Sequence, residues 1–271
     1  MSYSTIMVHL ESDGQVDVTG KIAAGLADRF HAELIGINAW MPRPRPIVDP
    51  DVSAREFEHL KAATLSLGEK FRQKMSADSR KVDCRTFLEF PTECIVREAR
   101  AADLLVIARE FAVNDPYLYP DPAAIVLKAG RPVLVVPPGT AALAARRAIV
   151  AWKDTREARR AVSDALPFLH IADEVIVTEI CELDADIAVS QRRLRDVVQY
   201  LSRHGVPCVV DRVRSVEGGT AVVSLLNLVR DSSADLVVAG AYGHSRLGEW
   251  MFGGVTQGLL EQSPVCLLLS H

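Results

Sequence analysis

Short runs of apolar residues alternate with amphipathic segments along the whole chain. The runs at 104–108 and 236–239 consist entirely of Val, Ile, Leu and Ala. The segments between such runs repeat apolar residues at helical spacing, for example at Ile22, Leu26 and Phe30. Strands without polar positions are typical of a parallel sheet that helices cover on both faces. The pattern therefore predicts an α/β fold built of open parallel sheets.

Each half of the chain is predicted to hold five strands joined by helices. In the first half the expected strands are 5–10, 32–40, 84–90, 104–108 and 133–136, and the expected helices run through 22–30, 53–75 and 92–102. Residues 109–132 are expected to form a long connection. In the second half the expected strands are 148–152, 174–180, 207–213, 236–239 and 265–269, with helices over 157–169, 187–204, 221–231 and 254–262.

The chain also repeats itself at a constant offset of 132 residues. Asp103 and Asp235 precede matching apolar runs, and a proline follows each of them after 29 positions. Such a repeat predicts two tandem domains of one fold, 1–138 and 147–271, joined by a short linker. The first domain is ten residues longer before the matching aspartate, and we place this excess in the proline-rich segment 41–50.

Charge and composition narrow the class of protein. The net charge is −4, and arginine pairs such as Arg192 and Arg193 have acidic neighbours, so we expect solvated helix faces and no nucleic-acid partner. No apolar stretch approaches the ~18–20 residues of a membrane helix, and the N-terminus lacks the pattern of a secretion signal. We therefore expect a cytoplasmic protein with no membrane partner.

The cysteines carry no recognisable chemistry. The five cysteines are scattered, without a Cys-x-x-Cys pair, and most lie in or beside apolar runs. This arrangement favours buried thiols over disulfides, a structural metal site or a catalytic nucleophile.

The strongest candidate site is a glycine pattern in the second half. Gly240-x-x-Gly243 begins where a buried strand ends, and nine residues separate Gly243 from Gly253 and Gly254 at the start of the last helix. Ligands of open α/β sheets bind at the carboxyl ends of the strands, and the free amides of a helix start attract anions. The pattern suits a nucleotide with its base and ribose near the strands and its phosphates on the amides. A tight turn is the alternative for Gly-x-x-Gly alone.

The full spacing resembles the universal stress protein family, whose nucleotide-binding members carry Gly-x-x-Gly, nine residues, then Gly-Ser or Gly-Thr. The resemblance is most specific over 147–170 and 235–269. It implies that the last strands, 133–136 and 265–269, pair around a pseudo-twofold axis, and it leaves a homodimer open. It also implies an adenine nucleotide, ATP with Mg²⁺ in the first place, as the ligand. The predicted nucleotide-binding residues are Ala151, Lys153, Ala239, Gly240, Gly243, Ser245, Arg246, Gly253, Gly254, Val255 and Thr256.

The chain departs from the family pattern at several positions. Gly254 stands where nucleotide binders have Ser or Thr, and Lys153 stands where many members carry an Asp associated with the ribose. Lys153 faces either phosphate or solvent, and Arg246 is either a phosphate ligand or a surface residue. The first half has Ala-Arg-Glu-Phe at 108–111 in place of the glycine pair, and we expect it not to bind nucleotide by the usual route.

Three functions compete. The first is a tandem universal stress protein that binds or senses adenine nucleotide without catalysis. The second is an interaction protein of the same fold that needs no nucleotide, and the third is a slow ATP hydrolase. The chain has no Walker motif, and we predict no catalytic residues. Valine at Gly240 or Gly253 is expected to abolish nucleotide binding and to leave the fold intact.

Overall fold

The computed structural model describes residues 2–10, 18–43, 50–76, 81–109, 115–181, 187–216, 219–242 and 254–271, without the side chains of 50–54, 56, 59 and 60. The chain divides into two compact units. Tyr3–Ala129 form the N-terminal unit, and Gly130–His271, with Met1–Ser2, form the C-terminal unit.

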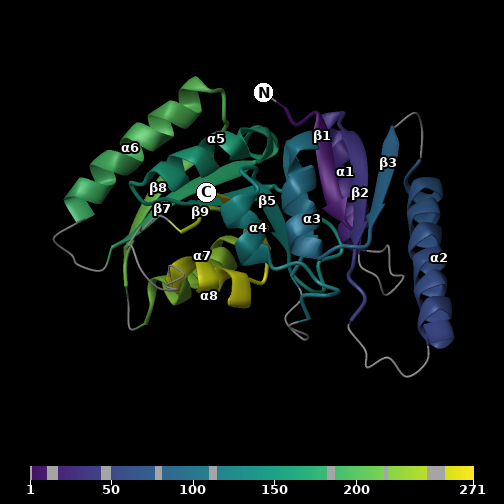
Figure 1. Cartoon of the computed structure of the whole chain (residues 1–271). Helices are drawn as coiled ribbons and strands as arrows, with labels where there is room; N and C mark the ends of the chain where they lie inside the picture. Colours follow the sequence, from purple (N-terminus) through teal and green to yellow (C-terminus); the bar gives the residue numbers. More distant parts are fainter. Residues whose placement is uncertain are drawn as a thin grey trace. The chain divides into compact units, whose positions relative to one another are not determined.

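The N-terminal unit is an α/β layer structure with a parallel sheet (Figure 1). Its strands have the spatial order β3-β2-β1-β4 and are all parallel. The strands are β1 (Thr5–His9), β2 (Glu33–Ala39), β3 (Val82–Phe87) and β4 (Leu104–Ala108). The helices are α1 (Val18–Phe30), α2 (Pro50–Met75), α3 (Pro91–Glu98) with the short turn η1 (Ala99–Ala101), and α4 (Pro122–Lys128).

The C-terminal unit has the order β5-β10-β9-β6-β7-β8. Its strands are β5 (Val133–Val136), β6 (Arg147–Ala151), β7 (Glu174–Cys181), β8 (Val209–Ser215), β9 (Leu236–Gly240) and β10 (Cys266–Ser270). The helices are α5 (Arg156–Ile171), α6 (Ile187–Arg203), α7 (Ala221–Ser232) and α8 (Gly254–Gln262). All strand pairs are parallel except β5 with β10, which is antiparallel and joins the two last strands as expected. Through this pairing β5 belongs to the C-terminal unit, so the described units hold four and six strands in place of five each.

The predicted α/β class and parallel strands are confirmed, but three local predictions are corrected. Helix α4 occupies part of the expected connection; it has seven residues, too few for a clear helical period. Asp121 caps α4 by accepting a hydrogen bond from the Ala123 amide (2.9 Å). The edge strands β3 and β8 are shifted by about two residues from the predicted ranges, because edge strands are half exposed and lack a continuous apolar run.

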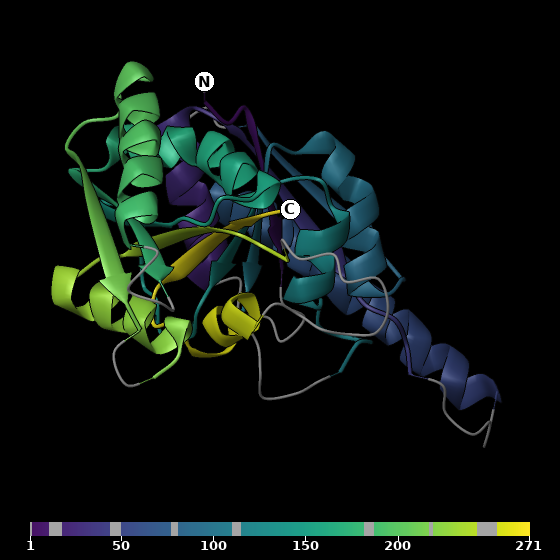
Figure 2. The same cartoon turned by 90° about the vertical axis from the view of Figure 1, so that its left-hand side faces the viewer.

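The extra length of the first half lies mainly in α2, which contradicts its placement in 41–50. Helix α2 has 26 residues where the corresponding helix α6 has 17. The C-terminal half of α2 packs on the sheet, with Leu67, Phe71 and Met75 buried, whereas Phe57 in the N-terminal half is 39% exposed. Figure 2 shows the N-terminal half extending past the strands of its unit. Residues 44–49 of the proline-rich segment lie outside the described part of the chain.

The repeated aspartates have the same structural role in both units. Asp103 accepts hydrogen bonds from the amides of Ser4 (2.8 Å) and Thr5 (3.0 Å) at the start of β1. Asp235 accepts them from the amides of Arg146 (3.2 Å) and Arg147 (3.1 Å) at the start of β6. Asp103 therefore joins the start of β1 to β4, and Asp235 joins the start of β6 to β9.

We expect Asp235→Ala to lower the free energy of unfolding of the C-terminal unit by about 1–3 kcal/mol, because two amides lose a charged acceptor. Urea denaturation of the full chain measures this loss. The control is Asp231→Ala, since Asp231 makes an exposed pair with Arg214 (3.4 Å) that contributes at most ~1 kcal/mol. Equal losses in the two variants would contradict a special role for Asp235.

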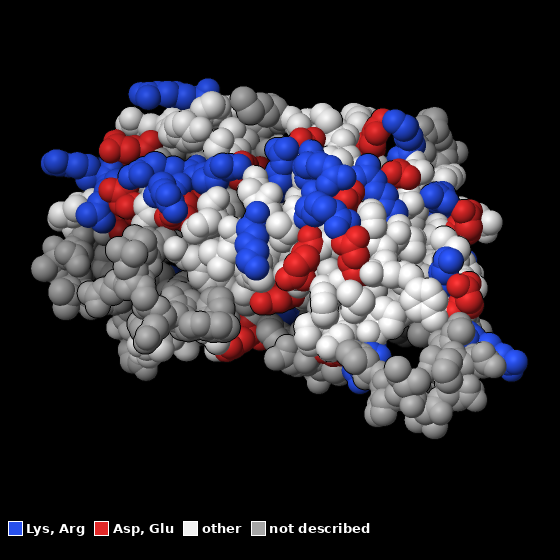
Figure 3. Space-filling model, in the orientation of Figure 1, with Lys and Arg blue, Asp and Glu red and all other residues white. Residues whose placement is uncertain are grey.

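Several arginines on the helices of the C-terminal unit pair with carboxylates. Arg159 pairs with Asp154 (2.6 Å), Arg160 with Asp164 (3.1 Å), and Arg193 with Glu179 (3.1 Å). Figure 3 shows basic and acidic side chains interspersed over α5 and α6. These helix faces are therefore mixed surfaces, as expected from the sequence.

Four of the five cysteines are buried and Cys208 is exposed. Burial raises the pKa of Cys84 to about 11 and that of Cys94 and Cys266 to about 12, so these thiols stay protonated near neutral pH. Within the described ranges, no helix is long and apolar enough to cross a membrane.

Candidate functional site

The carboxyl edge of the C-terminal sheet brings together part of the predicted site. Ala151 at the end of β6 pairs in register with Thr178 of β7 on one side and with Ala239 of β9 on the other. Side chains in register on parallel strands share a face, so these three form one row across the sheet. Gly240 follows Ala239 directly, and Gly254 begins α8. We call Thr178, Ala151 and Ala239 the edge row.

Four of the eleven predicted residues lie outside the described part of the chain, namely Gly243, Ser245, Arg246 and Gly253. Their roles stay predictions.

Gly240 is required by helix packing. A Cβ on Gly240 would lie 2.4 Å from the Ala158 nitrogen and 2.5 Å from the Glu157 carbonyl carbon, both in the backbone of α5. Backbone atoms cannot move away as a flexible side chain can, so α5 approaches β9 this closely only because residue 240 lacks a side chain. The expectation that valine at Gly240 leaves the fold intact is therefore wrong.

The edge row lies on the other face of the sheet. Neighbouring residues of a strand point to opposite faces, so Ala239 points away from the face where Gly240 meets α5. In Figure 1, α5 and α6 cover one face of this sheet, and α7 and α8 cover the other. Helix α7 contacts β6 and β7. Two of the three side chains in the row end at Cβ, so the row presents small side chains on this face.

The N-terminal unit has larger side chains at the positions that correspond to the edge row. His9 ends β1, as Ala151 ends β6, and it pairs in register with Ile37 of β2. Ile107 of β4 stands one residue beyond Val106, which pairs with Val8. His9 is 3% exposed, Ile37 0% and Ile107 1%. Burial lowers the pKa of His9 to about 4, so the ring is neutral near pH 7. The two units thus differ at this edge in side-chain volume as well as in glycine content.

Two polar groups beside the predicted site were not identified from the sequence. The Thr178 hydroxyl and the Trp152 indole nitrogen are buried and have no hydrogen-bond partner among the described residues. Buried polar atoms without partners are rare in folded proteins and call for a specific explanation. Thr178 gave no signal in the sequence because threonine is an ordinary strand residue.

The turn after β6 directs its charges to the surface. Lys153 is exposed, and its carbonyl accepts a hydrogen bond from the Thr155 amide (2.7 Å). Asp154, the residue after Lys153, is paired with Arg159. Glu157, in the first turn of α5, is buried and pairs with Arg156. Burial alone would raise the pKa of Glu157, but hydrogen bonds from Arg156, its own backbone amide and Thr155 lower it below its usual range.

The start of α8 presents backbone more than side chains. Gly254 is exposed, and a Cβ added there would meet no atom within 4 Å. Val255 is 43% exposed, whereas Thr256 is 7% exposed. Of these three predicted residues, Gly254 and Val255 are therefore at the surface, and the Thr256 side chain is turned into the unit.

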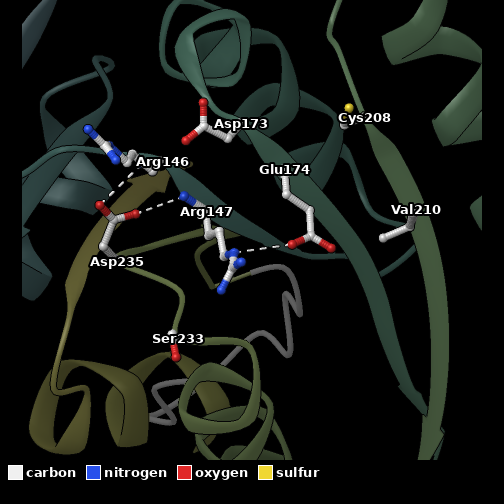
Figure 4. Close-up of a pocket in the computed structure, with 8 residues that line it drawn as sticks. All are labelled: Arg146, Arg147, Asp173, Glu174, Cys208, Val210, Ser233 and Asp235. Carbon is white, nitrogen blue, oxygen red and sulfur yellow. Dashed lines mark hydrogen bonds and ion pairs between the residues drawn. The ribbon is translucent and has the colours of Figure 1, made fainter.

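The opposite, amino edge of the same sheet holds an open cleft of about 680 Å³. Its wall includes Asp173, Cys208 and Ser233, and Arg147 crosses it to pair with Glu174 (3.2 Å), as Figure 4 shows. The cleft lies at the strand starts, and none of the described residues of the predicted site lines it. Across the described ranges, no group of three or more His, Cys, Asp and Glu side chains is placed to hold a metal ion.

In the N-terminal unit, the helix at the corresponding place has fewer free amides at its start. Helix α4 follows the segment of the N-terminal unit that corresponds in sequence to the glycine-containing segment of the C-terminal unit. It has Pro122 in its first turn. A proline there removes one of the free amides that would bind an anion. Residues 110–114 lie outside the described part of the chain.

Comparison with known proteins agrees with this architecture. Residues 131–271 match the model of the universal stress protein family. A universal stress protein from Archaeoglobus fulgidus DSM 4304 has a similar structure, with a TM-score of 0.73 and 14% identity over 98% of this chain and 97% of that one. A functionally unknown protein from Pseudomonas aeruginosa PAO1 matches with a TM-score of 0.64 and 15% identity over 99% and 92% of the two chains.

At these identities the structural matches show the fold alone. No curated protein is significantly similar in sequence. The family match covers more than half of the chain, including β6 to β10 and the edge row. The chain therefore belongs to the universal stress protein family.

Proposed function

We propose that the C-terminal unit binds an adenine nucleotide, ATP in the first place, and that the protein acts as a nucleotide-binding or nucleotide-sensing module without catalysis of its own. The observation that carries this proposal is the edge row: small side chains stand at the ends of β6 and β9 next to Gly240, and an unpartnered hydroxyl on β7 stands in register with them. The N-terminal unit, with His9 and two isoleucines at the same level, serves another role in this proposal.

The parts of the nucleotide are assigned by chemistry. The base and ribose lie over Ala151 and Ala239, because a flat ring needs contact without obstructing side chains. The phosphates, with their Mg²⁺, lie at the start of α8, whose free amides and dipole favour negative charge. Gly254 supplies an amide and no hydroxyl, so phosphate contacts there are made by the backbone. Lys153 is near enough in sequence to Ala151 to add positive charge at the rim.

The second candidate is an interaction protein that needs no nucleotide. Two observations favour it: Lys153 is exposed in place of the family's acid, and Asp154 is held by Arg159. Weak or absent nucleotide binding would support this alternative. A slow ATP hydrolase is the third, and prolonged incubation with ATP followed by chromatography for ADP and AMP tests it.

We expect millimolar ATP to raise the melting temperature of the full chain, because a ligand that binds only the folded state stabilises it by RT ln(1 + [L]/Kd), about 2.7 kcal/mol at one hundred times Kd. Thermal-shift titration with Mg-ATP measures the effect. Chromatography of the supernatant after denaturing freshly purified protein detects nucleotide that co-purifies. No shift and no co-purified nucleotide would refute the proposal.

A matched pair of variants locates the site. Ala151→Leu imitates the filled edge of the N-terminal unit and should remove the ATP-induced shift. Ser4→Ala changes a residue at the opposite end of the strands of the other unit, and it should leave the shift unchanged. An ATP response that Ala151→Leu retains would place the nucleotide elsewhere.

A further inference from the structure

Thr178 carries a polar group without an explained role. Its side chain is 1% exposed, and its hydroxyl has no hydrogen-bond partner among the described residues. Its backbone carbonyl is already engaged, because it accepts a hydrogen bond from the Trp152 amide (2.7 Å). A buried hydroxyl without a partner opposes folding unless something else satisfies it. The free hydroxyl is therefore the group that a ligand could satisfy.

The position of Thr178 relates it to the nucleotide site. It stands in register with Ala151, which in turn stands in register with Ala239. A planar base lying over the two alanines would bring one edge towards the third member of the row. We propose that the Thr178 hydroxyl hydrogen-bonds the edge of the adenine ring and so is a specificity-determining residue of this site. The inference rests on the proposed function, since it requires that a nucleotide binds there.

The chemistry of the group fits this role. A hydroxyl both donates and accepts, and the adenine edge offers a ring nitrogen that accepts and an amino group that donates. The matching residue of the N-terminal unit is Ile37, which can do neither. The contrast agrees with a base-binding role that is confined to the C-terminal unit.

Ser270 provides a matched control at the same edge. Its hydroxyl is also buried and has no hydrogen-bond partner in the described ranges. However, Ser270 pairs in register with Gly240, so its side chain shares the face on which Gly240 meets α5, opposite to the edge row. A change at Ser270 tests the effect of removing a buried hydroxyl without touching the proposed base contact.

The experiment compares Thr178→Val, Thr178→Ser and Ser270→Ala with the unchanged protein. Calorimetric titration measures the affinity for ATP, AMP and inorganic tripolyphosphate. We expect Thr178→Val to weaken ATP and AMP by the same factor, about three- to ten-fold, because one hydrogen bond to the shared base is lost. Tripolyphosphate, which has no base, should bind as before. Thr178→Ser keeps the hydroxyl and should bind ATP nearly as well as threonine does, and Ser270→Ala should change none of the affinities.

The outcomes separate the inference from the proposed function. ATP binding that Thr178→Val leaves unchanged would overturn the role of Thr178 and leave the proposed function standing. An equal loss for ATP and tripolyphosphate would also overturn it, since the effect would then act through the fold. No ATP binding by the unchanged protein would overturn the proposed function and the inference together.

Discussion

Replacing Gly240 by alanine is expected to destabilise the C-terminal unit by about 2–4 kcal/mol, at the upper end of the cost of overpacking a core. The added Cβ would lie 2.4–2.8 Å from three backbone atoms of Glu157 and Ala158. Relief of this overlap requires α5 to move away from β9, which would disturb the packing along the helix. Urea denaturation and thermal unfolding of the full chain measure the loss.

The control for Gly240 is Gly254→Ala. Both glycines belong to the predicted phosphate-binding pattern, but a Cβ at Gly254 meets no atom within 4 Å. We expect this variant to change the free energy of unfolding by less than about 1 kcal/mol, and a gain is as reasonable as a loss because alanine favours helix. Equal stability of Gly240→Ala and the unchanged protein would show that Gly240 serves ligand approach and not helix packing.

The second large effect is expected at Glu98 in the N-terminal unit. Its carboxylate is 4% exposed and pairs with Arg85 (2.9 Å), Arg97 (3.2 Å) and Arg100 (3.0 Å). Burial alone would raise the pKa of Glu98, but hydrogen bonds from Arg97 and Arg85 and the charge of Arg100 lower it below its usual value. Glu98→Gln should cost about 2–4 kcal/mol near pH 7, because three arginines lose their shared anion.

The pH dependence follows from the direction of the shift. A carboxylate whose pKa is lower in the folded state stabilises that state above its unfolded pKa, near 4, and the contribution is lost as pH falls through the folded pKa. The stability difference between Glu98→Gln and the unchanged protein should therefore shrink between about pH 5 and pH 2. Urea denaturation at several pH values measures it, with Glu93→Gln as the control, since Glu93 lies exposed on the same helix. A difference that is constant over this range would contradict the assignment.

The role of Gly240 changes how the glycine pattern should be interpreted. A glycine at the end of a strand can serve a ligand, a turn or the packing of a helix, and the first and last of these produce the same sequence signal. Here packing against Glu157 and Ala158 accounts for Gly240 without a ligand. The case for a nucleotide therefore rests more on the edge row, where no packing requirement explains the Thr178 hydroxyl.

Much of the fold could be predicted from the sequence because buried parallel strands leave a strong local signal. Strands β1, β4, β5 and β9 have continuous apolar runs, and the predicted ranges agree with them to about one residue. The signal failed where burial is partial. Helix α4 has seven residues, and β8 is an exposed edge strand, so neither has a long periodic pattern.

The structural role of the repeated aspartates could not be predicted from the pattern of hydrophobic residues. Asp103 and Asp235 marked matching positions in the two halves of the sequence. Only the structure shows that each carboxylate accepts hydrogen bonds from two backbone amides at the start of the neighbouring strand. Asp103 is 98 positions from Thr5 in the sequence, and Asp235 is 88 positions from Arg147. Contacts over such separations have no fixed spacing in the sequence.

The sequence by itself determined the α/β class and the location of the glycine pattern, because these depend on local periodicity and on spacing along the chain. Only the tertiary structure decided that Gly240 touches α5 and that Thr178 completes a row with Ala151 and Ala239. Each of these depends on strand register and helix approach, which arise from packing between segments far apart in the chain.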